Sequence, residues 1–194
     1  MRLPGQDPPT AADALGISRF VSTRQLGAPG IGSTVPDWVS TSTQLAYSGS
    51  TTITNPIDPS IVVRWPTQAT VTFPEVGSTW ARSALRSVTS INGVAQSGQQ
   101  DGVSSGTGLF WWSPDALAAM TTGQVLDTDP VTGLTLTVGS SGSGPTGPTL
   151  DIESQMVGAA GRFTYDVASG VLLRYQVQTQ ANGTAIDLVL QAMP

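Results

Sequence analysis

The sequence contains no histidine, no cysteine and no lysine, and each absence excludes a set of mechanisms. Without cysteine there is no disulfide, no thiol nucleophile and no thiolate metal site. Without histidine the chain has no serine–histidine–aspartate triad and no histidine-ligated zinc or haem. Without lysine it forms no Schiff base and has no P-loop. Any catalytic site would therefore have to rely on carboxylates, and we expect no cofactor.

Positive charge is also scarce. The 194 residues carry 8 basic groups, all of them arginine, against 13 acidic groups, for a net charge of -5. A nucleic-acid binder needs clustered cations that displace counterions, so we expect no nucleic-acid partner. The same deficit disfavours anionic lipid head groups. No apolar run reaches the roughly 18 to 20 residues of a membrane helix, so we expect no transmembrane segment.

Small polar residues are abundant instead. The chain has 22 Gly, 14 Pro, 21 Ser and 25 Thr. This composition, with few charges and arginine in place of lysine, favours an extracytoplasmic location in the cell envelope or outside the cell. A GC-rich genome would also replace lysine by arginine. The first residues lack the apolar core of a signal peptide, so we expect an export signal that is absent from this chain.

The distribution of turn-forming residues predicts the organisation of the chain. Residues 1–35 read as an extended arm rich in proline and glycine, with a short helix starting at Thr10 and a strand at Ile17–Val21. Residues 36–194 read as a single antiparallel β domain. Short Thr- and Val-rich segments between turn residues predict about ten strands, and hence a mainly β barrel, half-barrel or sandwich.

Several strand boundaries follow from local turn signals. The segment Trp80–Ile91 fits a helix or a strand. Asn92-Gly93 predicts a two-residue hairpin turn, because both residues tolerate positive φ. Gly98–Gly108 and Gly139–Pro148 read as loops by composition. The remaining expected strands in the first half are Gln44–Tyr47 and Thr51–Thr54, joined by a turn at 48–50, and Ile61–Trp65 and Thr70–Phe73, divided by Pro66.

The last quarter of the chain has the clearest pattern. Four segments with an apolar residue at every second position, separated by short turns, predict an antiparallel meander with one buried face. The turns are expected at Gly158–Gly161, Ala168–Gly170 and Asn182-Gly183. The expected inner residues are Leu150, Ile152 and Met156; Phe163, Tyr165 and Val167; Leu173, Tyr175 and Val177; and Ile186, Leu188 and Leu190.

One short helix is expected at about 113–121. Ser113 is a favoured N-cap residue, Pro114 suits the first helical position, and Asp115 complements the helix dipole. Gly123 is the expected terminator.

Two pairs of acids are candidates for chemistry. Asp127 and Asp129 lie two residues apart in a predicted loop and could bind Ca²⁺ through oxygen ligands, although the alternative is an ordinary β-turn. Asp151 and Glu153 share one face of a strand. They could serve a carboxylate-based hydrolase acting on carbohydrate, or they form a solvated face paired with Arg162 or Arg174 on neighbouring strands.

Tryptophan supplies the candidate binding residues. If extended, adjacent Trp111 and Trp112 point to opposite faces, so one of them needs a ligand, a partner or a second covering layer. Indole rings suit partner surfaces and lipid-like pockets. We therefore predict a ligand- or partner-binding region at Trp111, Trp112, Trp80 and Trp65, with plain core packing as the alternative.

These observations favour a non-enzymatic envelope or extracellular β module. It would bind a partner protein or an apolar, lipid-like ligand, and it could be a subunit of a larger assembly or a homo-oligomer. Two alternatives stay open. One is a carboxylate-based hydrolase acting on carbohydrate, and the other is a structural protein of a virion or surface lattice.

Overall fold

The computed structural model describes residues 34–55, 57–58, 60–78, 80–105, 109–128, 135–181 and 184–193. The strands are β1 (Gln44–Thr54), β2 (Val62–Val76), β3 (Trp80–Ile91), β4 (Val94–Ser105), β5 (Val125–Thr128), β6 (Thr135–Ser143), β7 (Pro148–Met156), β8 (Ala159–Asp166), β9 (Leu172–Ala181) and β10 (Thr184–Ala192). The helix is α2 (Pro114–Ala119). Residues 1–33 of the predicted arm, with its helix and strand, lie outside the described residues.

All ten strands belong to one antiparallel sheet in the order β4-β3-β2-β1-β10-β9-β8-β7-β6-β5. Two meanders, β1–β4 and β5–β10, are joined because β1 pairs with β10. The mainly β prediction of about ten strands with one short helix is thus confirmed. Among the described strands the two edges, β4 and β5, do not pair, so the sheet is not closed into a barrel. No described helix is long and apolar enough to cross a membrane.

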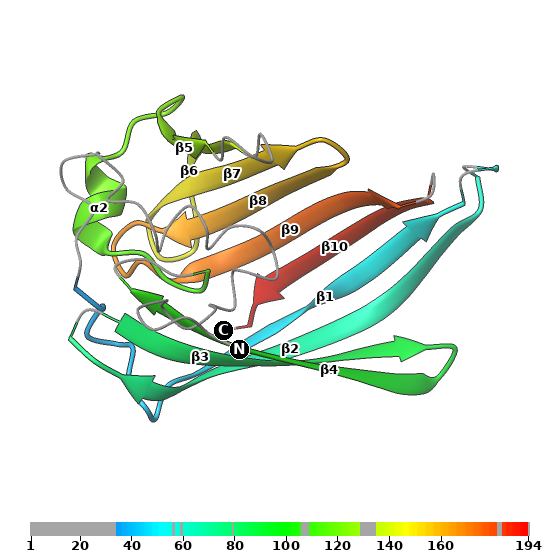
Figure 1. Ribbon diagram of the computed structural model, residues 1–194, viewed down its shortest axis with the longest axis horizontal. Helices are drawn as coiled ribbons and strands as arrows, with labels where there is room; N and C mark the ends of the chain where they lie inside the picture. Colours follow the sequence, from blue (N-terminus) through cyan, green and yellow to red (C-terminus); the bar gives the residue numbers. More distant parts are fainter. Residues whose placement is uncertain are drawn as a thin grey trace, which may run out of the picture.

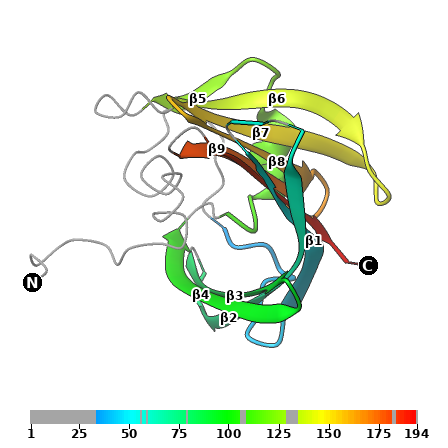
Figure 2. The same ribbon diagram turned by 90° about the vertical axis from the view of Figure 1, so that its right-hand side faces the viewer.

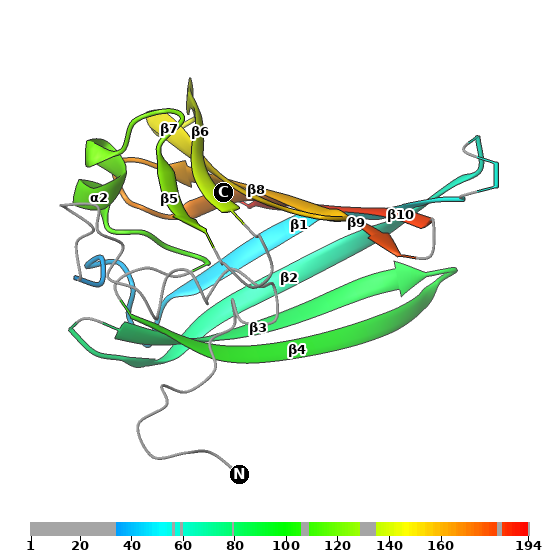
Figure 3. The same cartoon turned by 45° about the horizontal axis from the view of Figure 1, so that its top comes forward.

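The sheet is strongly curved, so that its two halves face each other across a concave inner side (Figure 2). Alternate residues of each strand point inward, as the period of a strand requires. They form one continuous apolar core with the segment that precedes α2. The helix lies at one end of the curved sheet (Figures 1 and 3). The largest fully buried side chains are Trp111, Trp112, Tyr47, Tyr165, Phe73 and Phe163.

The segment before α2 is fastened to the sheet by backbone hydrogen bonds. Leu172 N–H donates to the carbonyl oxygen of Phe110 at 3.1 Å, and Trp112 N–H donates to that of Gly170 at 2.9 Å. The predicted helix at 113–121 is confirmed as α2, with Ser113 at its N-cap. The prediction that Gly123 ends this helix is wrong, because the helix ends at Ala119 with Met120 as its C-cap, and Gly123 lies in the turn that follows.

A break predicted within the first strand is wrong. Gln44–Tyr47 and Thr51–Thr54 form one strand, β1, that runs through Gly49. A Cβ atom at Gly49 would lie 1.8 Å from the carbonyl oxygen of Val189 in β10. This glycine therefore permits the close approach of a neighbouring strand and does not mark a turn.

A second predicted break, at Pro66, is also wrong, because β2 runs through it. Pro66 pairs with Ser50 of β1, whereas the ladder between β2 and β3 begins only at Thr67. Pro66 therefore has a partner strand on one side only, which is where a sheet tolerates proline.

Two segments expected to be loops are largely strand. The described part of 98–108 continues β4 as far as Ser105, and 139–143 continue β6. The ladder between β3 and β4 runs without a shift from Trp80 opposite Ser105 to Ile91 opposite Val94. This pairing also settles Trp80–Ile91 as a strand, since a partner strand outweighs weak local propensity.

The turns follow the sequence in part. Asn92 and Gly93 have φ values of 51° and 82° and join β3 to β4, which confirms the predicted hairpin turn. The turn between β7 and β8 is shorter than expected and consists of residues 157 and 158. Asn182-Gly183 lies outside the described residues.

The four-strand meander β7–β10 is confirmed, with one error of register among the described side chains. Those of Met156, Ile186 and Leu188 lie outside the described residues. The sequence places Leu173 on the inner face, but the structure buries Leu172 instead. Tyr165 pairs with Leu172 and Thr164 pairs with Arg174, so Leu173 is the extra residue of a bulge.

Candidate functional site

An apolar cavity of about 240 Å³ lies on the concave side of the sheet. The lining side chains come from both meanders and from the segment before α2. None of the described lining residues is charged. They are Tyr47, Thr51, Thr67, Ala69, Leu85, Ser87, Thr89, Leu109, Phe110, Leu172, Tyr175 and Leu190.

The strand register brings the inner wall of the cavity together. Tyr47 of β1 lies opposite Ala69 of β2, which in turn lies opposite Ser87 of β3. The Tyr47 ring is 6.3 Å from that of Phe110. Its hydroxyl donates a 3.0 Å hydrogen bond to the carbonyl oxygen of Leu172. Tyr47 thus connects β1 to the segment before α2 and to Leu172 of β9.

The phenol groups in this wall stay uncharged. Burial raises the pKa of Tyr47 and of Tyr175 well above the ordinary value of 10.0. Desolvation disfavours the phenolate because the charged form loses its hydration. The aromatic part of the cavity therefore carries no charge across the physiological pH range.

A row of three threonine hydroxyls crosses the neighbouring strands at the same site. Thr67 Oγ1 lies 3.0 Å from Thr51 Oγ1 and 3.1 Å from Thr89 Oγ1. Thr67 is buried, whereas Thr51 and Thr89 are half-buried. The threonine row is thus a polar strip on an otherwise largely apolar wall.

The four tryptophans of the predicted binding region lie in different environments. Trp111 and Trp112 are 1% and 2% exposed and belong to the core rather than to the cavity lining. Both faces of this segment are covered, which is the condition under which two adjacent indoles can be buried. Their neighbour Phe110 lines the cavity. Trp65 and Trp80 are half-buried, and the Trp80 indole packs against Gly77.

Neither acid pair forms a described metal site. The backbone of Asp127 belongs to β5, but its side chain and the whole of Asp129 lie outside the described residues, so this calcium prediction stays a prediction. Among the side chains that the structure describes, no cluster of three or more potential ligands could hold a metal ion.

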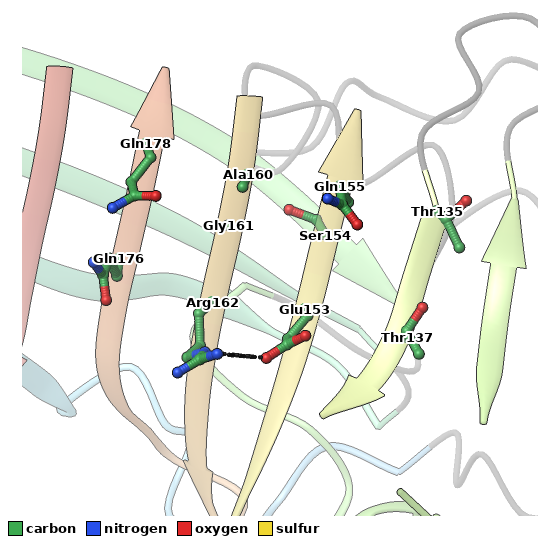
Figure 4. Close-up of a pocket in the computed structure, with 10 residues that line it drawn as sticks. All are labelled: Thr135, Thr137, Glu153, Ser154, Gln155, Ala160, Gly161, Arg162, Gln176 and Gln178. Carbon is green, nitrogen blue, oxygen red and sulfur yellow. Dashed lines mark hydrogen bonds and ion pairs between the residues drawn. The ribbon is translucent and has the colours of Figure 1, made fainter. Parts of the chain in front are cut away.

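The other acid pair belongs to a polar hollow on the outer face of β6–β9. Arg162 Nη2 lies 2.9 Å from Glu153 Oε1, and Arg162 Nε lies 3.9 Å from Asp151 Oδ2. The expected cross-strand pairing with Arg162 is therefore confirmed. Figure 4 shows this ion pair among amide and hydroxyl side chains, including Gln176 and Gln178.

One buried carboxylate holds the turn between β8 and β9. Asp166 accepts hydrogen bonds from Thr146 Oγ1 at 2.7 Å and from the backbone N–H and hydroxyl of Ser169 at 2.8 and 2.6 Å. Burial acts to raise the pKa of this carboxyl group, but the hydrogen bonds from Ser169 and Thr146 outweigh it. The pKa lies below its ordinary value of 3.8.

We expect Asp166→Asn to lower the free energy of unfolding at pH 7 by about 1 to 3 kcal/mol, because one of the two accepting oxygens becomes an NH2 group that cannot accept the hydrogen bonds from Thr146 or from Ser169. A depressed pKa stabilises the fold above the unfolded value, and this contribution disappears as the pH falls through the folded value. In urea unfolding, the difference between wild type and variant should therefore shrink from pH 7 to pH 3. An equal difference at both values would contradict this role.

The sequence reading missed most of the cavity. Tyr47, Leu172 and Leu190 come from strands far apart in the sequence, and no local pattern connects them. The sequence does contain regularly spaced threonines in its β-like segments. This spacing does not show whether the threonines lie on the inner or the outer face of the sheet.

Fold and cavity define an open, curved antiparallel sheet with an uncharged, mainly apolar inner site. No protein-family model, curated protein or solved structure matches this chain.

Proposed function

We propose that this chain is a non-enzymatic binding module of the cell envelope or the extracellular space that holds an apolar small molecule in the inner cavity. The observation that carries the proposal is the cavity of about 240 Å³ with no charged group among its described lining residues. Binding sites for small molecules are concave and mainly apolar, with a few polar groups that fix orientation. The aromatic wall and the threonine row fit that description.

We propose a half-barrel rather than a sandwich as the architecture of this module. In a sandwich, two sheets pack face to face about 10 Å apart and fill the space between them. Here one sheet continues through the β1–β10 ladder, and the segment before α2 lies within the curve. Phe110 from that segment forms part of the cavity wall. The tryptophan-rich segment would thus contribute to binding by shaping the wall, with Trp111 and Trp112 supporting it from behind.

Filling the cavity should weaken binding strongly. We expect the protein to bind the uncharged apolar fluorophore N-phenyl-1-naphthylamine. The phenyl ring of Ser87→Phe would occupy part of the cavity and remove apolar contacts with the probe. We therefore expect this variant to bind the probe about tenfold more weakly or worse, a loss of at least about 1.4 kcal/mol. The measurement is a fluorescence titration of the folded proteins.

The matched control is Ser90→Phe, which makes the same change on the opposite face of β3. Both serines are half-buried, so the two variants differ mainly in the face that receives the ring. Ser90→Phe should bind the probe like wild type. Absence of probe binding by the wild type, or equal weakening by both variants, would overturn the proposed site.

A further inference from the structure

We propose that the cavity selects a lipid with a single aliphatic chain and an uncharged, hydroxyl-bearing end, such as a fatty alcohol or a monoacylglycerol. This inference rests on the proposed function and concerns the same cavity. Its basis is the chemistry of the threonine row formed by Thr51, Thr67 and Thr89 and the lack of charge around it.

The threonine row offers both donors and acceptors. Each hydroxyl has one hydrogen and two lone pairs. The two hydrogen bonds within the row use two of its three hydrogens, so one hydrogen and several lone pairs remain. A ligand hydroxyl, which can donate and accept, matches this set. A carboxylate can only accept, and it would find a single hydrogen.

The wall gives an anion no cation, and only isolated hydroxyl groups, to offset the loss of its hydration. Burial of an ionised carboxylate is costly unless a cation or several hydrogen bonds compensate. No arginine is among the described lining residues, and Tyr47 already donates its hydroxyl hydrogen to Leu172. An ionised fatty acid should therefore be rejected, whereas its protonated form should be accepted.

The register gives the ligand a direction. Thr67 and Thr89 lie opposite each other, two residues along β2 and β3 from the Ala69 and Ser87 pair. Strand β2 runs toward the α2 end of the sheet (Figure 1), so Thr67 lies farther from that end than Ala69. Ala69 lies opposite Tyr47, whose ring is 6.3 Å from that of Phe110. The chain of the ligand would lie toward Phe110, with its hydroxyl at the threonine row. Sites for drug-sized ligands measure about 300 to 1,000 Å³. The cavity of about 240 Å³ is smaller than these sites and therefore suits a single aliphatic chain.

The test is competition against N-phenyl-1-naphthylamine by decanol, decanoate and decane on the full chain. At pH 8 we expect decanol to displace the probe at concentrations at least about tenfold lower than decanoate, which corresponds to the cost of an unpaired charge. Decanoate should compete better at pH 5 than at pH 8, because only its protonated form fits.

The variant Thr67→Val isolates the hydroxyl. It should weaken decanol binding by about two- to tenfold, the value of one neutral hydrogen bond, and leave decane binding unchanged. Thr70→Val is the control, because Thr70 lies on the opposite face of the same strand. If the probe binds but decanol and decanoate compete equally at pH 8, or Thr67→Val does not distinguish decanol from decane, the inference is wrong and the proposed function stands. If the probe does not bind, the proposed function itself fails.

Discussion

A Gly49→Ala variant should lose about 3 kcal/mol or more of its free energy of unfolding, because the added methyl group meets backbone rather than a movable side chain. The new Cβ atom would lie 1.8 Å from the carbonyl oxygen of Val189 and 2.8 Å from its carbonyl carbon. Relief requires β1 and β10 to separate, and their ladder is what joins the two meanders. The measurement is urea unfolding followed by circular dichroism.

Gly142→Ala is the matched control for loss of a strand glycine. Gly142 is an exposed residue of β6, and a Cβ atom there has Thr149 Oγ1 as its neighbour at 3.0 Å. That hydroxyl belongs to a side chain, so a small shift relieves the contact, and the change in stability should stay within about 1 kcal/mol. Similar losses for the two variants would show that the β1–β10 contact has no special role.

The features of this fold that could be predicted are those determined by residues close together in the sequence. Asn92-Gly93 fixes a hairpin through its own backbone preferences, and Ser113 with Pro114 marks the start of α2. The β7–β10 meander was visible because short turns keep each strand next to its partner, so the inner face repeats at every second residue. The bulge at Leu173 was not predicted, because one extra residue in a strand has no distinctive local sequence pattern.

The errors share a different physical cause. Gly49, Pro66 and the glycine- and glutamine-rich β4 resemble loops when read alone. Each is held in the sheet by a neighbouring strand, and local propensity is weak against a complete ladder. Gly49 in particular is explained by Val189, which lies 140 positions away in the sequence.

The candidate site was harder to foresee than the fold. Aromatic richness pointed to Trp111 and Trp112, but these rings are buried in the core and do not line the cavity. The cavity depends instead on Tyr47, Thr67 and Leu190, which the β1–β2 and β1–β10 ladders bring together. Such a site exists only after the strands have paired, so a local sequence pattern does not identify the residues that line it.

Trp111→Ala should be among the most destabilising single substitutions in this chain, at about 3 to 5 kcal/mol, because it empties a fully buried indole site. The more informative substitution is Trp111→Phe. The Trp111 Nε1 group is buried and has no hydrogen-bond partner, so its removal relieves a cost of about 1 to 3 kcal/mol that opposes the loss from the smaller ring. In contrast, the Trp112 indole nitrogen is not left buried without a partner, and the Trp112 ring packs 6.3 Å from that of Tyr165.

Trp112→Phe therefore relieves no such cost, and it loses part of a buried indole that packs on the Tyr165 ring. In parallel urea unfolding experiments, Trp111→Phe should remain within about 1 kcal/mol of wild type, and Trp112→Phe should fall about 2 kcal/mol or more below it. The two residues are adjacent and almost equally buried, so the comparison tests whether the unpartnered N–H group of Trp111 carries a cost. Equal losses would mean that volume alone governs this layer, and a larger loss for Trp111→Phe would mean that its N–H group has a partner in solution.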